Sequence, residues 1–265
     1  MASRVLLPAG AAFDAIASSF DAAFDPWLSV AAQRAAVRAE FLAAFTDGAK
    51  LLEVGGGTGK DAAWLVERGR QVFLTDASPA MVREAERKIG ESRAESIPAE
   101  DLGILAERGM QFDGAYSNFA ALNCVGDLAP VGRALARVVR PGGKAVLVLF
   151  GCCCPAEIFT EALRGRWGNC FRRFRRGAVP ASLRGWRFTV RYHRGADIAR
   201  AMAPDFRLVD RKAVGLLVPP SAAEPWISRH PKLLARLEAA DRRLARSLAP
   251  LGDHVLYVFE RRGGR

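Results

Sequence analysis

The chain has 265 residues, half of them hydrophobic, which is long enough for one large domain with a substantial core. It contains no run of 18 apolar residues and begins without the long apolar region of a signal peptide, so neither a membrane span nor secretion is expected. The five cysteines form no disulfide framework and predict a protein with reduced thiols in the cytoplasm.

Residues 10–45 are expected to form helices, because apolar side chains recur there at nearly helical spacing. Pro26 divides this stretch in two, since proline has no N–H for the helical hydrogen bonds. We therefore predict a helical cap over residues 1–45.

A glycine-rich turn follows the next predicted strand. Residues 51–59 read Leu-Leu-Glu-Val-Gly-Gly-Gly-Thr-Gly, and a helical pattern begins at Asp61. The apolar residues predict a buried strand, while the glycines permit positive φ angles and let a ligand approach the backbone. Strand, glycine turn and helix in this order are typical of a nucleotide-like cofactor site at the carboxyl edge of an α/β sheet.

Three glycine-loop patterns compete for this turn. The P-loop pattern Gly-x-x-x-x-Gly-Lys-Ser/Thr fails, because Val54 and Asp61 occupy two of its fixed positions. The dinucleotide pattern ends on Lys60 in one register and on Ala62, which it permits, in the other, so a nicotinamide or flavin cofactor stays open. The third pattern, Glu/Asp-x-Gly-x-Gly-x-Gly, is matched at every position of residues 53–59.

Later segments extend this third pattern. Residues 71–76 predict a second strand that ends in an acid, and residues 77–81 predict a turn into the next helix. Residues 112–119 predict a strand with a polar end, and residues 137–150 a Pro-Gly-Gly turn before another strand. With the glycine turn, these segments resemble the class I S-adenosylmethionine (SAM) methyltransferases over about residues 45–150. The resemblance implies a doubly wound, Rossmann-like α/β sheet of seven strands whose last strand is antiparallel, with SAM as the cofactor.

The resemblance also implies roles for individual residues. Asp76, which lies 17 residues after Gly59, would accept hydrogen bonds from both ribose hydroxyls. Glu53 would orient the ammonium group of the methionine part. The residues expected to bind the cofactor are Glu53, Gly55, Gly56, Gly57, Gly59, Asp76, Ala77, Met81, Ala99, Glu100 and Asn118.

The adenine end of the expected site has open alternatives. Met81 would pack near the adenine, but an ordinary place in the helix core is equally open. Pro98 stands where the family often has an acid that binds the adenine amine. Glu100, Asp101 or a backbone carbonyl would take its place, unless both acids are only solvated loop residues.

The second half of the chain departs from the minimal fold. A helix at residues 196–203 is expected to lead into strand six at residues 206–209 or a little beyond, so residues 151–193 form an insertion. A second insertion at residues 219–252 precedes the last strand, residues 255–259. Both are expected to leave the sheet on the cofactor side and to build the substrate pocket and its lid. The predicted units are the cap (1–45), the SAM-binding core (46–150), the first insertion (151–193) and the completion of the core with the second insertion (194–265).

The positive charge is concentrated in one segment. Residues 163–212 carry fourteen basic residues, thirteen of them arginine, against three aspartates, which accounts for the whole net charge of +11. This segment either attracts a small anionic substrate, or contacts nucleic acid or an acidic membrane, or is a solvated surface, the most ordinary of the three.

Few residues qualify as catalytic groups. Methyl transfer requires a nucleophile in line with the methyl group, and a hydroxyl or protonated amine also needs a base. His254, beside Asp253, and His193 are the candidate bases, with structural hydrogen bonding as the alternative for each. Asn118 lies where the family's active-site residue follows strand four. The Asn-Pro-Pro-Tyr pattern of methyltransferases that act on nucleic-acid amines is absent, so a nucleic-acid target is not expected.

The adjacent cysteines Cys152, Cys153 and Cys154 predict no metal site, because structural zinc prefers spaced cysteines. The sequence as a whole predicts a SAM-dependent methyltransferase that acts on an O, N or C atom of a small molecule, which one interpretation of the charge makes anionic. Two alternatives stay open. One is a non-catalytic SAM- or nucleotide-binding module that contacts RNA, membrane or protein, and the other is a nicotinamide-dependent reductase.

Overall fold

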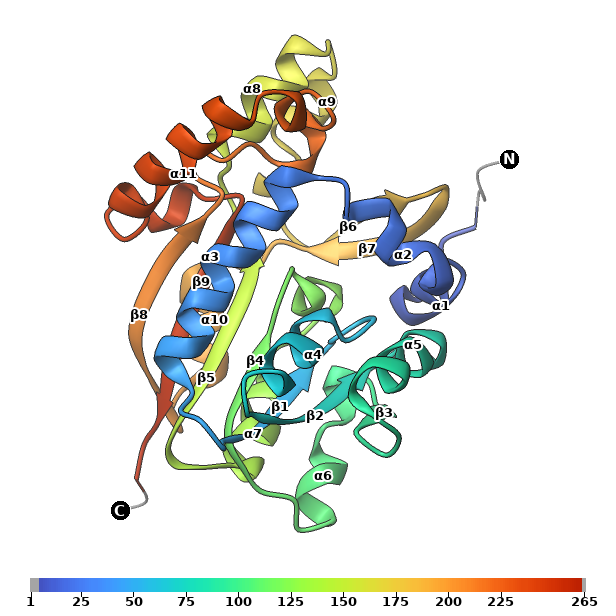
Figure 1. The fold of residues 1–265 in the computed structure, drawn as a ribbon, viewed down its shortest axis with the longest axis vertical. Helices are drawn as coiled ribbons and strands as arrows, with labels where there is room; N and C mark the ends of the chain where they lie inside the picture. Colours follow the sequence, from blue (N-terminus) through green and yellow to red (C-terminus); the bar gives the residue numbers. More distant parts are fainter. Residues whose placement is uncertain (1–4, 264–265) are drawn as a thin grey trace.

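The structure is a computed structural model that describes residues 5–263. Within them the main sheet consists of β1 (Lys50–Val54), β2 (Gln71–Asp76), β3 (Ala94–Ser96), β4 (Phe112–Ser117), β5 (Val139–Phe150), β8 (Phe206–Val214) and β9 (His254–Arg261). Their order is β3-β2-β1-β4-β5-β9-β8 (Figure 1). β9 pairs antiparallel with both β5 and β8, whereas the pairs among β1 to β5 are parallel. The predicted doubly wound sheet with an antiparallel last strand is confirmed.

Helices cover both faces of this sheet. One face carries α3 (Leu28–Ala44), α4 (Lys60–Val66) and α5 (Pro79–Ile89), and the other carries α6 (Gly103–Glu107), α7 (Ala129–Val138) and α10 (Gly195–Met202). Each group buries an apolar stripe against the strands, as Phe41 does from α3 and Leu135 from α7. No helix within residues 5–263 has the length and apolar composition needed to cross a membrane.

The elements that hold the glycine turn follow directly from the local sequence. Leu51, Leu52 and Val54 are buried in β1, because helices cover both faces of the sheet. α5 starts after Ser78, whose hydroxyl accepts a hydrogen bond of 3.1 Å from the backbone N–H of Met81. The turn between β1 and α4 therefore lies between a fully buried strand and a well-capped neighbouring helix.

The described chain opens with two short helices, α1 (Ala9–Asp14) and α2 (Ala17–Phe24). They lie beside α5 at the carboxyl edge of the sheet (Figure 1). The Asp14 carboxylate accepts a hydrogen bond of 2.5 Å from the Ser78 hydroxyl, and Asp21 accepts one of 2.7 Å from Thr58. These contacts hold the helices against the glycine turn and the start of α5. Residues 1–4 of the predicted cap lie outside the described residues.

The first insertion contains short helices followed by a hairpin. Its elements are α8 (Pro155–Leu163), α9 (Trp167–Cys170), η3 (Arg172–Phe174), β6 (Ala178–Leu183) and β7 (Trp186–Arg191). The hairpin packs on α1, where the rings of Phe13 and Phe188 lie 5.3 Å apart. The helices lie apart from it, at the end of the molecule where Figure 1 also shows α11. The insertion therefore has two parts, and only the hairpin approaches the N-terminal helices.

The second insertion folds against α3. It contains η4 (Ser221–Ala223), η5 (Ile227–Arg229), α11 (Pro231–Leu244) and η6 (Ala249–Leu251). Val218, Ile227 and Leu234 form a small apolar cluster against Ala32 of α3. α11 ends at Leu244, and the carbonyl of the next residue, Ala245, accepts a hydrogen bond from the N–H of Ala213 in β8. β8 itself runs to Val214.

A buried arginine joins the first insertion to the sheet. Arg173 is only 5% exposed, and its guanidinium donates hydrogen bonds of 2.6 Å to the Asp253 carboxylate and 2.7 Å to the Asp253 carbonyl. It also pairs with the buried carboxylate of Glu157 in α8. Burial alone would raise the pKa of Asp253, but the adjacent His254 ring and the charge of Arg173 hold it below its ordinary value. Arg173 thus compensates two buried acids that come from different elements.

Candidate active site

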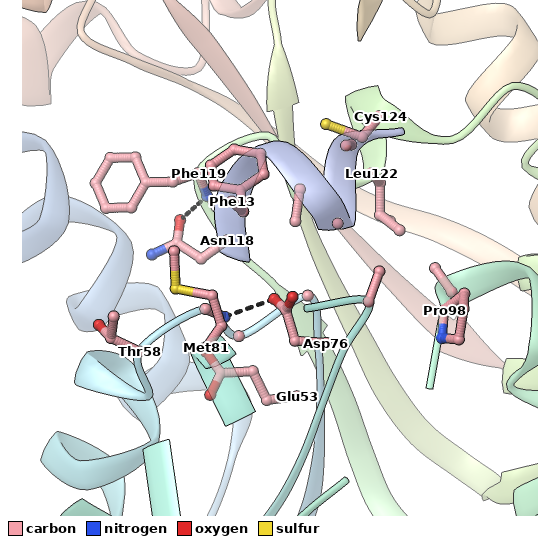
Figure 2. Close-up of a pocket in the computed structure, with 18 of the residues that line it drawn as sticks. Phe13, Glu53, Thr58, Asp76, Met81, Pro98, Asn118, Phe119, Leu122 and Cys124 are labelled. Carbon is pink, nitrogen blue, oxygen red and sulfur yellow. Dashed lines mark hydrogen bonds between the residues drawn. The ribbon is translucent and has the colours of Figure 1, made fainter. Parts of the chain in front are cut away.

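A cavity of about 570 Å³ lies at the carboxyl ends of β1, β2 and β4. This is the edge at which ligands bind in open α/β sheets. Of the residues predicted to bind the cofactor, all but Gly59 line the cavity. They are Glu53, Gly55, Gly56, Gly57, Asp76, Ala77, Met81, Ala99, Glu100 and Asn118. Figure 2 shows several of them, with Asn118 toward one end and Pro98 toward the other.

The glycine turn forms the floor of the cavity. The N–H groups of Gly55 and Gly56 both donate to the carbonyl of Thr75, which fixes the turn on β2. Gly57 has a φ of +55° and open space where a Cβ would stand, so its backbone is accessible to a ligand. Gly59 instead turns the chain into α4, where a Cβ would contact Ala85 at 2.9 Å.

Asp76 connects the turn to the next strand. Its carboxylate accepts hydrogen bonds of 2.8 Å from the N–H groups of Gly57 and Ser78, one on each oxygen. Figure 2 shows the first of these bonds. Burial raises its pKa above the ordinary value, although these two backbone donors oppose the shift. Each carboxylate oxygen can accept a further hydrogen bond, so Asp76 keeps the capacity to bind two ligand hydroxyls.

Glu53 is a buried acid of the cavity. It is 2% exposed, and its Oε2 atom has no hydrogen-bond partner among the described residues. Burial, followed by the nearby charge of Asp61, raises its pKa well above the ordinary value. A buried carboxyl without a partner is unfavourable, so this position favours a ligand that brings a positive charge.

Asn118, Asp61 and Arg34 converge at the other end of the cavity. The Asn118 amide donates a hydrogen bond of 2.8 Å to Oδ2 of Asp61, and Nη1 of Arg34 donates one of 2.6 Å to the same oxygen. Arg38 holds the second oxygen of Asp61 at 2.8 Å. Burial of Asp61 alone would raise its pKa, but the two arginines lower it, so this carboxylate is ionised. The sequence analysis assigned no role to Asp61, Arg34 or Arg38.

The chain turns sharply after Asn118. Phe119 and Ala120 have φ angles of +46° and +63°, a region that residues with side chains rarely adopt. Oδ1 of Asn118 accepts a hydrogen bond of 2.7 Å from the Phe119 N–H, and the Arg34 guanidinium lies 4.5 Å from the centre of the Phe119 ring. These contacts hold the strained turn, and Figure 2 shows the hydrogen bond between Asn118 and the Phe119 N–H at the edge of the cavity that Phe119 lines.

Neither candidate histidine lines the cavity. His254 is 5% exposed, and its ring stacks on Phe150 at 4.8 Å and meets the edge of Phe119. His193 is also buried, and its Nε2 lies 3.0 Å from the carbonyl of Val125. Burial lowers the pKa of both rings, so each is neutral at physiological pH. The structure therefore brings Asn118 to the site and leaves both histidines outside it.

The two insertions contribute little to the cavity wall. From residues 151–193 only Thr189 of β7 lines the cavity, and no described residue of 219–252 does. The expectation that both insertions build the pocket is therefore wrong for the second one, because it folds onto α3 instead. Of the arginine-rich segment 163–212, again only Thr189 reaches the cavity. Among the cysteines, Cys124 lines the wall, and burial raises its pKa to about 12.

The segment that forms most of this site matches a known protein family. Residues 52–147 match the family model described as "Methyltransferase domain". This segment is a methyltransferase domain. The match extends from β1 through β5 and includes the glycine turn, Asp76 and Asn118. The resemblance to class I SAM methyltransferases inferred from the motifs is confirmed.

Curated relatives match this methyltransferase domain and some flanking sequence. Malonyl-[acyl-carrier protein] O-methyltransferase of Salmonella typhimurium is 32% identical over 145 residues, which cover 52% of this chain and 54% of that protein. The enzyme of the same name from Pseudescherichia vulneris is 35% identical over 95 residues, 36% of each chain. The chain thus spans about half the length or less of the curated relatives it matches.

Solved structures share the fold over most of the chain. A SAM-dependent methyltransferase from Methanosarcina mazei has a TM-score of 0.55 and 16% identity, with coverage of 84% of this chain and 97% of that one. The complex of DhpI with S-adenosylhomocysteine (SAH), the demethylated product of SAM, has a TM-score of 0.53 and 20% identity, with coverage of 96% and 95%. At these identities the likeness concerns the fold.

The chemistry of the cavity fits SAM. The unpartnered Oε2 of Glu53 matches an ammonium group, and the open backbone at Gly57 leaves room for the methionine part. Asp76 retains acceptor capacity for the two ribose hydroxyls. Ile97 and Pro98 form an apolar wall beside Glu100 that would suit an adenine ring. The methyltransferase domain therefore presents a donor set that agrees with its family's cofactor.

Most cavity residues that were not predicted from the sequence lie outside the strands and turns expected to bind the cofactor. Phe13 and Phe20 line the cavity from the N-terminal helices, which were expected to form a cap but without named contacts. Asp61 had a usable signal, because an acid in the first turn of a helix after a glycine loop lies next to that loop. Arg34 and Thr189 had none, since their place depends on how α3 and β7 pack on the core.

Proposed function

We propose that this protein is a SAM-dependent methyltransferase that transfers a methyl group to a small-molecule acceptor. The observation that carries the proposal is the unpartnered Glu53 carboxyl in a cavity that also contains the glycine turn, Asp76 and Asn118. This combination would supply a site for the ammonium and the rest of the methionine part at β1 and the glycine turn, and for the ribose at the end of β2. The cytoplasmic location inferred from composition stays a prediction.

SAM, when bound, supplies an electrophilic methyl group on its sulfonium centre. The protein's part is to hold that group and the acceptor atom in line, and positioning of this kind contributes about 7–11 kcal/mol to a two-reactant step. Glu53 and Asp76 would hold the donor, and Asn118 and Phe119, which line the same cavity, would border the acceptor. Phe13 and Phe20 from the N-terminal helices would exclude water from it.

The two ends of the cavity differ in charge. We call the end with Glu53, Asp76 and Glu100 the cofactor end, and the end with Asn118 and Arg34 the acceptor end. Glu53, Asp76 and Glu100 are acids without a basic partner among the described ion pairs, which suits a cationic cofactor. The acceptor end holds Arg34, whose partner Asp61 is shared with Arg38. We propose that the hairpin β6–β7, through Thr189, completes this end of the site.

The alternatives have less support. Nothing in the cavity favours a nicotinamide over SAM, and the family match concerns methyltransferases. A non-catalytic module would not need the strained turn at Phe119 and Ala120, which directs side chains into the cavity. We therefore keep methyl transfer as the proposed activity.

Calorimetric titration with SAM, SAH and NADH is the first test of the proposal. We expect micromolar binding of SAM and SAH and no binding of NADH. Radiolabelled SAM should then transfer its methyl group to at least one member of a panel of small carboxylates, phenols and amines. Binding of NADH without binding of SAH would overturn the proposed cofactor, and SAH binding without transfer to any acceptor in the panel would favour the non-catalytic alternative.

A further inference from the structure

The outer face of α8 is apolar, and its inner face is acidic. Glu157 and Glu161 lie one helical turn apart and are buried. Phe159 and Leu163, also one turn apart, are 65% and 73% exposed. A helix on the surface of a globular protein normally has the opposite arrangement, with apolar residues inward and charges in water. The reversed arrangement indicates that the outer face of α8 contacts something less polar than water.

Internal partners hold both acids beneath the helix. Nε of Arg172 donates a hydrogen bond of 2.9 Å to Glu157, which also pairs with Arg173. Burial alone would raise the pKa of Glu157, but the two arginines lower it, so the buried group is ionised. Glu161 accepts a hydrogen bond of 2.8 Å from the Asn169 amide in α9. Neither acid is therefore presented to a ligand outside the helix.

The exposed apolar surface continues past α8. Trp167 at the start of α9 is 69% exposed, and Phe171 and Phe174, whose ring centres lie 6.2 Å apart, are exposed as well. The thiol of Cys170 contacts the Ile158 carbonyl at 3.6 Å, which holds α9 against α8. Large apolar side chains exposed in one group mark a site of interaction. We call the group the α8–α9 surface; it consists of Phe159, Leu163, Trp167, Phe171 and Phe174.

Only positive charges accompany these apolar residues. Residues 155–176 contain no acid besides the two buried glutamates of α8. Arg175 and Arg176 are exposed and take part in no ion pair within the described chain. Arg164 and Arg166 are also exposed, and they share one glutamate of α8 at 3.9 and 4.0 Å. The α8–α9 surface therefore combines apolar side chains with a net positive charge.

The neighbouring second insertion does not offset this charge. η4 contacts α8, and Figure 1 shows α11 at the same end of the molecule. Of the three acids in this insertion, Glu224 and Asp241 are buried, and Glu238 lies 3.9 Å from Arg242. An anionic ligand that reaches the α8–α9 surface thus meets no free carboxylate from the described residues of either insertion.

We propose that the α8–α9 surface binds anionic lipid membranes. The aromatic and leucine side chains would enter the boundary between headgroups and acyl chains, while the arginines pair with lipid phosphates. The two helices lie at one end of the molecule, where a flat bilayer can reach them (Figure 1). The proposal concerns contact with the membrane surface and does not depend on the proposed methyl transfer.

Other occupants fit this surface less well. A second copy of the chain, bound by the same surface, would bring the arginines of the two copies against each other. Single-stranded nucleic acid binds by stacking of bases on aromatic rings, but Leu163, the most exposed residue of the surface, has no ring. An acidic protein would match the charge but would need pockets for the protruding side chains, whereas a fluid bilayer needs none.

Flotation with lipid vesicles tests the proposal on the full chain. We expect the protein to bind vesicles of equal parts phosphatidylcholine and phosphatidylglycerol but not vesicles of phosphatidylcholine alone. Added salt should weaken this binding, because it screens the charges. Equal binding to both kinds of vesicle would contradict the role of the arginines. Failure to bind the mixed vesicles overturns the proposal, and binding of polyglutamate or polyuridylate in that case would assign the surface to an acidic protein or to RNA.

Paired double variants locate the charged part of the contact. Arg175→Gln with Arg176→Gln should weaken binding to the mixed vesicles by about 30-fold, which corresponds to about 1 kcal/mol for each arginine near an anionic surface. Arg133→Gln with Arg137→Gln, at exposed positions of α7, removes the same net charge elsewhere and should have little effect. Equal losses in the two double variants would show a general effect of net charge and contradict the assigned surface.

The apolar part of the contact has its own test. Leu163→Ser should weaken vesicle binding by about tenfold, whereas Ile104→Ser, at an exposed apolar position of α6, should not. Both side chains are exposed, so the unfolding temperature should stay unchanged in each variant. Tryptophan emission should shift to shorter wavelengths on vesicle binding, and Trp167→Phe should lose most of that shift. An undiminished shift in Trp167→Phe, or equal binding by the two serine variants, would contradict insertion of this surface.

Discussion

The backbone N–H of Gly57 donates a hydrogen bond of 2.8 Å to Oδ2 of Asp76, so the acid expected to hold the ribose also fixes the glycine turn. The turn and the acid come from two neighbouring parallel strands, β1 and β2. A ligand that binds the glycine turn is therefore held at a fixed position relative to Asp76. This coupling makes the cofactor site sensitive to small changes at Asp76.

Replacement of Asp76 should weaken cofactor binding. Asp76→Asn removes a charged acceptor from the ribose and from the Gly57 N–H, and such hydrogen bonds contribute about 1.5–3 kcal/mol each. We expect SAH affinity, measured by calorimetry, to fall by about 10- to 100-fold. Asp101→Asn, at an exposed loop acid outside the cavity, is the matched control. An equal effect of both substitutions would show that Asp76 has no specific role.

Glu53 should make cofactor binding depend on pH. Its pKa lies well above the ordinary 4.5, because burial and the charge of Asp61 disfavour the ionised form. Binding of an ammonium group requires the carboxylate, so below the raised pKa the affinity should fall by up to about tenfold per pH unit. Calorimetry in buffers with different ionisation enthalpies should detect the released proton.

The matched variant for this prediction is Glu53→Gln, which should abolish both the pH dependence and the proton release. The stabilising effect of the protonated Glu53 is lost as pH rises from its ordinary pKa of 4.5 through the raised pKa, because the unfolded chain releases a proton that the folded chain still holds. Glu53→Gln should therefore raise the unfolding temperature at neutral pH while it weakens SAM binding. A less stable variant with unchanged affinity would refute this account of Glu53.

Asp61 should matter for both stability and transfer. Asp61→Asn leaves Arg34 and Arg38 without their shared counter-charge, and loss of a partner in a buried ion pair costs about 3–5 kcal/mol, here reduced to about 2–3 because both arginines are partly solvated. Urea unfolding measures this change. The rate of a single turnover should fall more than SAH affinity does, because Arg34 and Asn118 both lose their anchor.

The control for this variant is Asp25→Asn, whose partner Lys60 is a surface residue. A surface ion pair contributes at most about 1 kcal/mol, so this variant should behave nearly as the unchanged protein does. If Asp61→Asn leaves the turnover rate unchanged, the convergence of Arg34 and Asn118 on Asp61 is only structural.

His254 should affect acid stability rather than turnover. Its pKa is below the ordinary 6.5, because burial outweighs the attraction of Asp253. The unfolded chain therefore binds a proton that the folded chain rejects, and stability should fall as pH decreases from 6.5 toward the lowered value. In His254→Phe this fall of unfolding temperature with acid should be smaller. A large loss of turnover with normal SAH binding would instead identify His254 as the base.

Features that depend on the order of neighbouring elements along the chain could be predicted from the sequence. The turn after β1 and Asp76 at the end of β2 could be placed because parallel strands end at the same edge of a sheet. The Arg34 contact could not be placed, because its partner Asp61 lies 27 residues away and the two meet only when α3 packs beside α4. Composition and spacing carry no information about that packing.

The sequence also could not predict which part of the core the second insertion packs against. The second insertion leaves the sheet next to β9, as expected, but its apolar residues Ile227 and Leu234 pack against Ala32 of α3. The surroundings of the His254 side chain could not be predicted either. Its place at the start of β9 was predictable, but the aromatic neighbour Phe150, which keeps it from the cavity, belongs to another strand.

The buried arginine of the first insertion has a consequence for how this protein can be shortened or recombined. If residues 151–193 were deleted or exchanged for those of a relative, Asp253 would keep its buried carboxylate but lose the guanidinium of Arg173. The sheet would then hold an uncompensated charge beside β9. The segment that distinguishes this chain from a minimal methyltransferase fold is therefore not modular, and any chimera must transfer Arg173 and Asp253 together.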